Sequence, residues 1–219
     1  MQAKITSQAR EQILGKIRKA LSANSLEIPF PEADRWNPDQ AFVTSDTDKE
    51  ELFAEHFVGL GGKFVFCANE QELFENIEAL NQSRGWSKLF CAEERLLHIA
   101  QNNKINFVQA SDNKDESADA CITNCEALVA RLGSFLMSSR QYLGRVSSVF
   151  YPVHIVVAYK ADVVYDIEDG FKKMEQKYGA NMPSMISLQT GPSRTADIEK
   201  TLVTGVHGPK EVFCFFVNV

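Results

Sequence analysis

The apolar residues of this chain fall into two alternating patterns from residue 46 onward. Short apolar runs predict strands at 63–67, 88–91, 106–109, 118–123, 134–138, 155–158, 163–165, 185–188 and 212–217. Apolar residues at helical spacing predict helices at 48–60, 70–82, 93–102, 124–131 and 167–178. Because parallel strands need a long crossover, usually a helix, this alternation is typical of βαβ units. The pattern predicts an α/β fold with a mostly parallel sheet flanked by helices.

The first 45 residues follow a different pattern. Residues 4–23 carry apolar residues at helical spacing with basic residues between them, which predicts an amphipathic helix. The segment that follows, 24–37, contains Pro29 and Pro31 and has no sustained period, so it reads as an extended strap. We therefore predict a helix and strap over 1–45 and an α/β domain over 46–219. The helix would contact a partner subunit or pack against its own domain.

A turn rich in hydroxyls follows the predicted strand at 185–188. Gly191 and Pro192 interrupt the apolar run, and the next residues supply two hydroxyls, a guanidinium and a carboxylate: Ser193, Arg194, Thr195 and Asp197. If Ser193 or Thr195 caps a short helical turn, free backbone N–H groups and Arg194 converge on one concavity, which suits a phosphate or carboxylate. In the alternative interpretation Arg194 pairs with Asp197 and only holds the turn.

A second chain reversal, 205–209, places His207 and Gly208 within a short distance of that turn in the sequence. We predict that they form a second wall of the anion site. An imidazole is available for acid–base chemistry near neutral pH, so His207 is also a candidate catalytic residue. The alternative is that His207 is a hydrogen-bonding spacer in a turn.

The run Thr190-Gly191-Pro192-Ser193-Arg194-Thr195-Ala196-Asp197-Ile198-Glu199, then Leu202-Val203-Thr204-Gly205-Val206-His207-Gly208-Pro209, resembles the signature of the lactate-utilisation protein C family, or LUD domain. The resemblance implies a fold like that of glucosamine-6-phosphate deaminase, ribose-5-phosphate isomerase and the CoA transferases. It also implies a bacterial role in oxidising L-lactate to pyruvate, alongside two partner proteins, one of which carries iron-sulfur clusters. It supplies no catalytic residue for the C member.

Glu126 is a second candidate catalytic residue, because members of the family often have an acidic residue there. They also show an Ala-Glu-Thr-Gly-Thr-like run where this chain has Ala130-Arg131-Leu132-Gly133-Ser134. Arg131 and Leu132 thus replace an acid and a threonine, so any role of that acid is lost or moved. The alternative interpretation of Glu126 is a solvated carboxylate on a helix.

Two arginines and a histidine complete the candidates. Arg140 ends a predicted strand and Arg145 lies in the polar loop predicted at 141–149, where either could join Arg194 on an anion. His154 stands in a Pro-x-His step similar to one in the family. It is a site residue or a hydrogen-bond donor at the start of a strand.

Composition excludes several classes of protein. With a formal charge of −6 and a pI near 5.3, the chain lacks the excess of basic residues that is typical of a nucleic-acid binder. Five cysteines lie mostly in apolar runs, and Cys121 and Cys125 lack the further ligands of a zinc or iron-sulfur site, so we expect no cofactor in this chain and place the clusters in a partner. The charged N-terminal segment does not read as a signal peptide, and no apolar run is long enough to span a membrane, so we expect a cytoplasmic protein.

These observations favour a component of an L-lactate oxidation system whose Gly-Pro-Ser-Arg-Thr turn binds a small anion. A stand-alone enzyme acting on a sugar phosphate or an acyl-CoA is one alternative, by analogy of fold. A non-catalytic assembly subunit with a purely structural turn is another. The sequence leaves the oligomeric state open.

Overall fold

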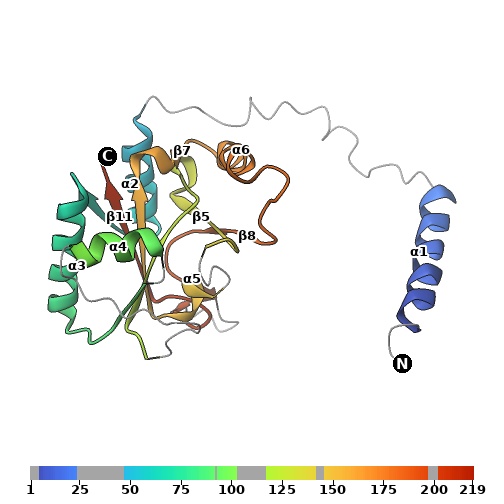
Figure 1. Cartoon of the computed structure of the whole chain (residues 1–219), viewed down its shortest axis with the longest axis horizontal. Coiled ribbons are helices and arrows are strands. Elements are labelled where there is room, and N and C mark those ends of the chain that lie inside the picture. Colours follow the sequence, from blue (N-terminus) through green and yellow to red (C-terminus); the bar gives the residue numbers. More distant parts are fainter. Residues whose placement is uncertain (1–4, 24–46, 92, 103–116, 142–145, 197–201) are drawn as a thin grey trace. The chain divides into compact units, whose positions relative to one another are not determined.

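The computed structural model describes residues 5–23, 47–91, 93–102, 117–141, 146–196 and 202–219 (Figure 1). It divides the chain into two units, Met1–Asp46 and Thr47–Val219. In the first unit, helix α1 covers Ile5–Ala23, where the apolar spacing predicts a helix. The predicted strap at 24–37 lies outside the described residues.

A five-stranded parallel sheet forms the centre of the second unit. Its strands are β1 (Lys63–Cys67), β2 (Leu89–Cys91), β3 (Ala120–Asn124), β6 (Val153–Tyr159) and β11 (Glu211–Val217). They lie in the order β1-β11-β6-β3-β2, and all neighbouring pairs are parallel. The predicted α/β fold with a parallel sheet and helices is confirmed. The predicted strand at 106–109 lies outside the described residues.

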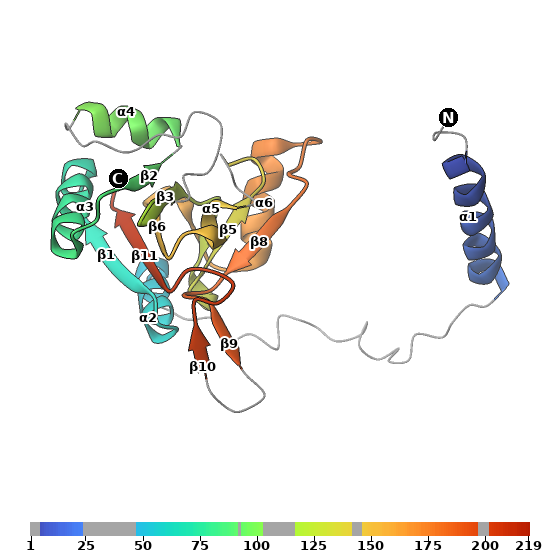
Figure 2. The ribbon, with the colours of Figure 1, turned by 90° about the horizontal axis from the view of Figure 1, so that it is seen from below.

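Helices cover both faces of this sheet. On one face, α3 (Glu70–Arg84) and α4 (Glu94–Asn102) share a core with alternate residues of the strands. On the other face, α2 (Lys49–Gly59) contributes Phe53 and Phe57, both fully buried. Figure 2 shows α4 and α2 on opposite sides of the sheet. The central strands β6 and β11 are therefore buried on both faces, which explains their continuous apolar sequences.

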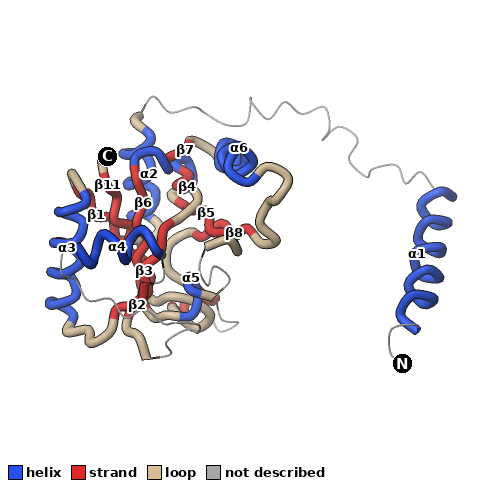
Figure 3. Tube along the Cα trace, in the orientation of Figure 1, coloured by secondary structure: helices blue, strands red, loops and turns tan. Residues whose placement is uncertain are grey.

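A second, four-stranded sheet packs on the face that α2 covers (Figure 3). Its strands are β7 (Val163–Val164), β4 (Ala127–Val129), β5 (Ser134–Ser138) and β8 (Ile186–Gln189), in the order β7-β4-β5-β8. β5 is antiparallel to β4 and β8, whereas β4 and β7 are parallel. Helix α6 (Ile167–Tyr178) packs on the far side of this sheet through Met174 and has Glu168 and Asp169 in its first turn.

The predicted helix at 124–131 is wrong. Residues 127–129 form β4, and a single 3-10 turn, Ala130–Leu132, links it to β5. Every residue from Cys125 to Ala130 is buried, so this segment has no polar face on which helical spacing can be distinguished from a strand. Gly133 ends the turn with φ +56, and an added Cβ would lie 2.4 Å from the backbone nitrogen of Phe57, so β5 starts where the chain touches α2.

Two further predictions need correction. The polar loop predicted at 141–149 contains the start of a short helix, α5 (Ser147–Phe150), whereas its residues 142–145 lie outside the described part of the chain. Ser193 does not cap a helical turn, because β9 (Arg194–Ala196) follows it directly and pairs antiparallel with β10 (Leu202–Thr204). The turn that Thr195 would cap reaches residues 197–201, which lie outside the described part of the chain. One more 3-10 turn, Lys160–Asp162, follows β6.

Candidate functional site

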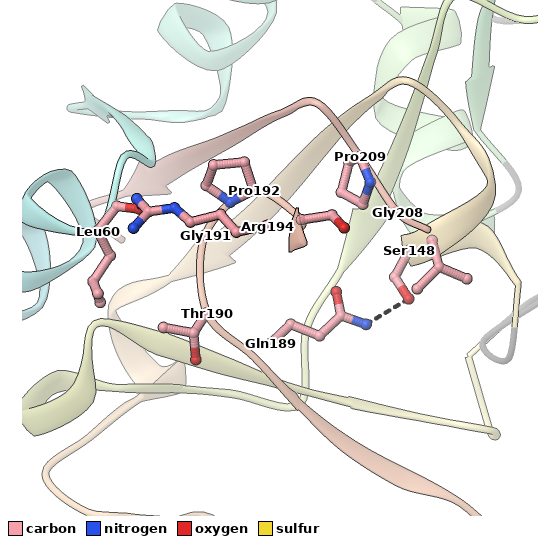
Figure 4. A pocket seen from close by; sticks show the side chains of 11 residues that line it. Leu60, Ser148, Gln189, Thr190, Gly191, Pro192, Arg194, Gly208 and Pro209 are labelled. Carbon is pink, nitrogen blue, oxygen red and sulfur yellow. Dashed lines mark hydrogen bonds between the residues drawn. The ribbon is translucent and has the colours of Figure 1, made fainter. Parts of the chain in front are cut away.

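The glycine-rich turn and the second chain reversal line one pocket of about 360 Å³. The turn contributes residues 189–194, and the reversal contributes Gly208 and Pro209. Leu60 from the end of α2 and Ser148 and Val149 from α5 complete the lining. Residues far apart in the sequence therefore meet at one concave site (Figure 4).

Backbone hydrogen bonds hold the turn against the reversal. The Ser193 nitrogen donates to the Pro209 carbonyl at 2.9 Å, and the Gly205 nitrogen donates to the Ser193 carbonyl at 3.0 Å. A Cβ added at Gly208 would lie 2.9 Å from the Ser193 Cβ, closer than side-chain carbons approach. At Gly191, where φ is +64, an added Cβ would lie 3.0 Å from the Leu60 carbonyl oxygen. These two glycines permit the close approach that shapes the pocket.

Arg194 joins the pocket to the end of α2. Its side chain is exposed, and its Nη2 donates to the Leu60 carbonyl (Figure 4). A cation at the carboxyl end of a helix is favoured by the helix dipole. Because a guanidinium carries five N–H donors, this contact leaves others for a ligand. Asp197, the carboxylate of the predicted anion site, lies outside the described residues.

A polar wall that the sequence did not reveal lies across the pocket from Arg194. The Gln189 Nε2 donates to the Ser148 Oγ at 2.6 Å (Figure 4). The Thr190 and Ser134 hydroxyls lie 2.7 Å apart, which connects the pocket to the start of β5. Neither Ser148 nor Gln189 stands in a recognisable motif, and only the pairing of β8 with β5 and the position of α5 bring them together.

Two predicted residues stand apart from the pocket lining. Thr195 pairs with Val203 in the two-stranded ribbon of β9 and β10, which extends from the rest of the unit in Figure 2. His207 is exposed at the second reversal, next to Gly208, yet it is not among the lining residues. The structure thus brings Gly191, Ser193, Arg194 and Gly208 together but not Thr195 or His207.

Glu126 is not a solvated carboxylate on a helix. It lies between β3 and β4, is 3% exposed, and accepts hydrogen bonds from three side chains. These donors are the Ser138 Oγ at 2.5 Å, the Tyr178 hydroxyl at 2.7 Å and the Lys177 Nζ at 2.8 Å. Burial raises the pKa of Glu126, but these bonds outweigh burial and hold that pKa below its ordinary value. The group is an ionised carboxylate with its lone pairs largely occupied.

Arg131, which replaces the acid of the family run, has a structural partner. Its guanidinium donates to both carboxylate oxygens of Asp166, at 2.9 and 2.7 Å. Asp166 caps α6, and the hydrogen bonds from Arg131 lower the pKa of its carboxyl. The side chain of Leu132 packs against the core beneath α6. Both replacements therefore serve to hold α6 on the second sheet.

Arg140 and His154 lie apart from the pocket lining. Arg140 donates to the Asn181 carbonyl at 2.9 Å, and Arg145 is outside the described residues. His154 is fully buried in β6, with its Nε2 2.8 Å from the Thr123 Oγ1. Burial lowers the pKa of His154 to about 3, so its imidazole is neutral at physiological pH. This histidine is a hydrogen-bonding residue of the core.

Glu93 is a titratable group that the sequence did not single out. It follows β2, and burial raises its pKa to about 7. A backbone hydrogen bond from Asn124 and the charge of Lys177 oppose that rise, whereas the charge of Glu126 adds to it. Its Oε1 is buried without a hydrogen-bond partner among the described residues. A carboxyl group half ionised near neutral pH thus lies close to the Glu126 cluster.

The described residues contain neither a metal-ligand cluster nor a membrane-spanning helix. In that part of the chain, no three or more His, Cys, Asp or Glu side chains gather as metal ligands would. None of the helices described there combines the length and the apolar content that a bilayer crossing requires.

Sequence comparison finds relatives in several bacilli. The chain is 36% identical over 107 residues to "Lactate utilization protein C" of Bacillus subtilis (strain 168), which covers 48% of this chain and 45% of that protein. It is 35% identical over 120 residues to the protein of the same name from Geobacillus thermodenitrificans, covering 54% of this chain and 49% of that one. The chain therefore spans about half the length of the curated relatives it matches.

A solved structure shares the fold. The crystal structure of a DUF162 family protein from Deinococcus radiodurans matches with a TM-score of 0.56, covering 78% of this chain and 99% of that one at 16% identity. The family model that describes the LUD domain matches residues 50–217, which is nearly the whole second unit. The chain belongs to the LUD domain family.

Proposed function

We propose that this protein is a component of an L-lactate utilisation system and that its pocket binds a small anion. The relatives named for lactate utilisation support the first part. The observation that carries the second is the pocket itself, about 360 Å³ with an exposed guanidinium on one wall and an amide–hydroxyl pair on the other. Lactate and pyruvate combine a carboxylate with a neighbouring oxygen, which matches this arrangement.

In this proposal Arg194 makes a charge-assisted pair with the carboxylate, using N–H groups that the Leu60 carbonyl does not occupy. The Ser193 hydroxyl supplies a further donor, and Asp197 orients the guanidinium. Gln189 and Ser148 bind the hydroxyl or carbonyl oxygen of the ligand. Gln189, Arg194 and Ser148 would each work from an element that the fold fixes: the end of β8, the start of β9 and α5.

Oxidation of lactate removes two electrons, so the system needs an electron acceptor. As the family resemblance implies, the proposal assigns that role to iron-sulfur clusters in a partner protein. This chain would then bind the anion and present it to the partner complex.

A non-catalytic assembly subunit is the second candidate. The contact between Arg194 and the Leu60 carbonyl favours it, because the guanidinium already stabilises the end of α2. The stand-alone enzyme on a sugar phosphate or acyl-CoA needs a free carboxylate base in the pocket. Glu126 already accepts three hydrogen bonds, and neither Glu126 nor Glu93 lines the pocket. That alternative is therefore the weaker of the two.

The test is a thermal-shift titration with lactate, pyruvate, phosphate, ribose 5-phosphate and coenzyme A. A ligand at about a hundred times its Kd adds roughly 2.7 kcal/mol, which raises Tm by about 5 to 10 °C. We expect lactate or pyruvate to stabilise the wild type and to leave Arg194→Ala unmoved. Arg140→Ala is the matched control, because Arg140 also donates to a backbone carbonyl but lies outside the pocket. No shift with any ligand would leave the assembly role.

A further inference from the structure

A groove of about 330 Å³ lies at the opposite end of α2 from the anion pocket. The first turn of α2 forms one side, and the ends of β1 and β11 form the other. Its floor includes Phe64, Phe66 and Phe216. Since the pocket borders the last turn of the same helix, the groove is a separate surface.

A row of aromatic rings leads from the core to this groove. The ring centroids of Phe53, inside the core, and Phe64 lie 6.1 Å apart. Phe64 stacks on Phe216 with a centroid distance of 6.0 Å, and the centroids of Phe216 and Phe66 lie 6.1 Å apart. Phe216 is buried, whereas Phe66 is 53% exposed on β1, an edge strand of the sheet. A half-exposed aromatic ring supported by packed rings is the kind of anchor that dominates protein interfaces.

Carboxylates surround the aromatic floor. Asp48, Glu50 and Glu51 line the groove from the N-terminal end of α2. Lys160 also lines the groove, and its Nζ lies 3.8 Å from the Glu50 Oε1. This ion pair is long, and the Lys160 side chain is 60% exposed. The Asp48 side chain makes no capping hydrogen bond. Negative charge around an apolar floor fits a segment that is both basic and apolar.

Helix α1 has that chemistry. Ile13, Ile17 and Leu21 stand four residues apart on one face and are 58%, 48% and 69% exposed. Lys16 and Arg18 flank this apolar stripe. Residues 1–23 hold five basic residues and one acidic residue, a formal charge of +4. Because the whole chain carries −6, residues 24–219 carry −10. The chain thus contains both a basic apolar helix and an acidic apolar groove.

We propose that the groove binds α1 of a second copy of this chain, with Ile13 and Ile17 on Phe66 and with Lys16 and Arg18 beside the carboxylates. Mutual exchange of the two helices gives a closed two-fold dimer in which each copy is both donor and acceptor. This inference is independent of the anion pocket, because the residues that carry it line a different surface.

The test is sedimentation velocity of the full chain over a wide range of concentration. We expect the wild type to dimerise, and Glu50→Lys with Glu51→Lys to weaken the dimer at least about tenfold. The matched control is Glu75→Lys with Glu78→Lys on α3, which changes the net charge equally away from the groove. A wild type that stays monomeric throughout, or a control that weakens the dimer as much, overturns the proposal.

A charge exchange tests the pairing itself and guards against a folding defect. Lys16→Glu with Arg18→Glu should also dissociate the dimer, and combining these changes with Glu50→Lys and Glu51→Lys should restore it. Failure of the combined variant to dimerise, with circular dichroism unchanged, contradicts the pairing.

An amphipathic basic helix can also bind anionic membranes. Flotation of the wild type with phosphatidylserine vesicles, together with a monomer in their absence, would assign α1 to a lipid surface instead.

Discussion

The Glu126 cluster and the Arg194 pocket both contain a charged side chain from the segments that carry the family resemblance, yet their surroundings differ. The Glu126 carboxylate is 3% exposed and has three donors. Arg194 is exposed, donates to one carbonyl among the described residues, and has an open pocket beside it. A buried charge with a complete set of partners belongs to the fold, whereas an exposed charge with unused donors is available to a ligand. Burial and hydrogen bonding thus separate two residues that the sequence presents as equal candidates.

Removing the buried charge should have the largest effect. Glu126→Ala leaves the Ser138 and Tyr178 hydroxyls without their shared acceptor and creates a cavity, so we expect a loss of about 3 kcal/mol in the free energy of unfolding. Urea denaturation measures it. Glu175→Ala, at an exposed position on the same α6, should change stability little. A loss at Glu126 no larger than at Glu175 would mean that the cluster is not structural.

The pH dependence of stability tests whether the buried Glu93 carboxyl, next to the Glu126 cluster, contributes to folding. Because the pKa of Glu93 is about 7 in the folded protein and ordinarily 4.5, the folded state binds this proton more tightly than the unfolded chain. This contribution is complete below pH 4.5, is lost as the pH rises to about 7, and amounts to roughly 3 kcal/mol. Glu93→Gln should remove that slope and become more stable than the wild type above pH 7.

Urea denaturation of both proteins from pH 4 to 8 measures the difference. His154 acts in the opposite direction, because its folded pKa of about 3 lies below the ordinary 6.5, so its contribution is lost as the pH falls below 6.5. Both proteins retain His154, and subtracting one profile from the other isolates Glu93. Parallel profiles would show that Glu93 titrates normally and that its burial has no energetic consequence.

The shape of the pocket gives a smaller effect. A Cβ at Gly208 would lie 2.9 Å from the Ser193 Cβ, so Gly208→Ala must separate the turn from the second reversal. We expect a loss of about 1 kcal/mol in stability and a larger loss of ligand-induced stabilisation. Gly59→Ala, where nothing lies within 4 Å of the added Cβ, is the control. Thermal denaturation with and without pyruvate reports both quantities. Unchanged ligand stabilisation in Gly208→Ala would place the binding site elsewhere.

The sequence predicted the parallel sheet because β1 and β2 are apolar runs between helices of clear period. It failed where burial is complete. Residues 125–130 are all buried, so the second sheet, and with it the partners of Glu126, could not be read from periodicity. Local turn chemistry did identify the glycine-rich pocket segment, whereas Gln189 and Ser148 come together only through strand pairing and α5. The raised pKa of Glu93 likewise depends on burial that no spacing encodes.

The smallest expected effect decides between the two roles of Arg194. Its guanidinium is exposed and its hydrogen bond to the Leu60 carbonyl faces solvent, so Arg194→Ala should cost no more than about 0.5 to 1 kcal/mol in the absence of ligand. Urea denaturation without added anions measures this cost. A loss of several kcal/mol would mean that the contact with α2 is structural and would favour the assembly role. A small loss combined with complete loss of ligand stabilisation would instead make Arg194 a binding residue, because the fold then does not depend on the group that the ligand needs.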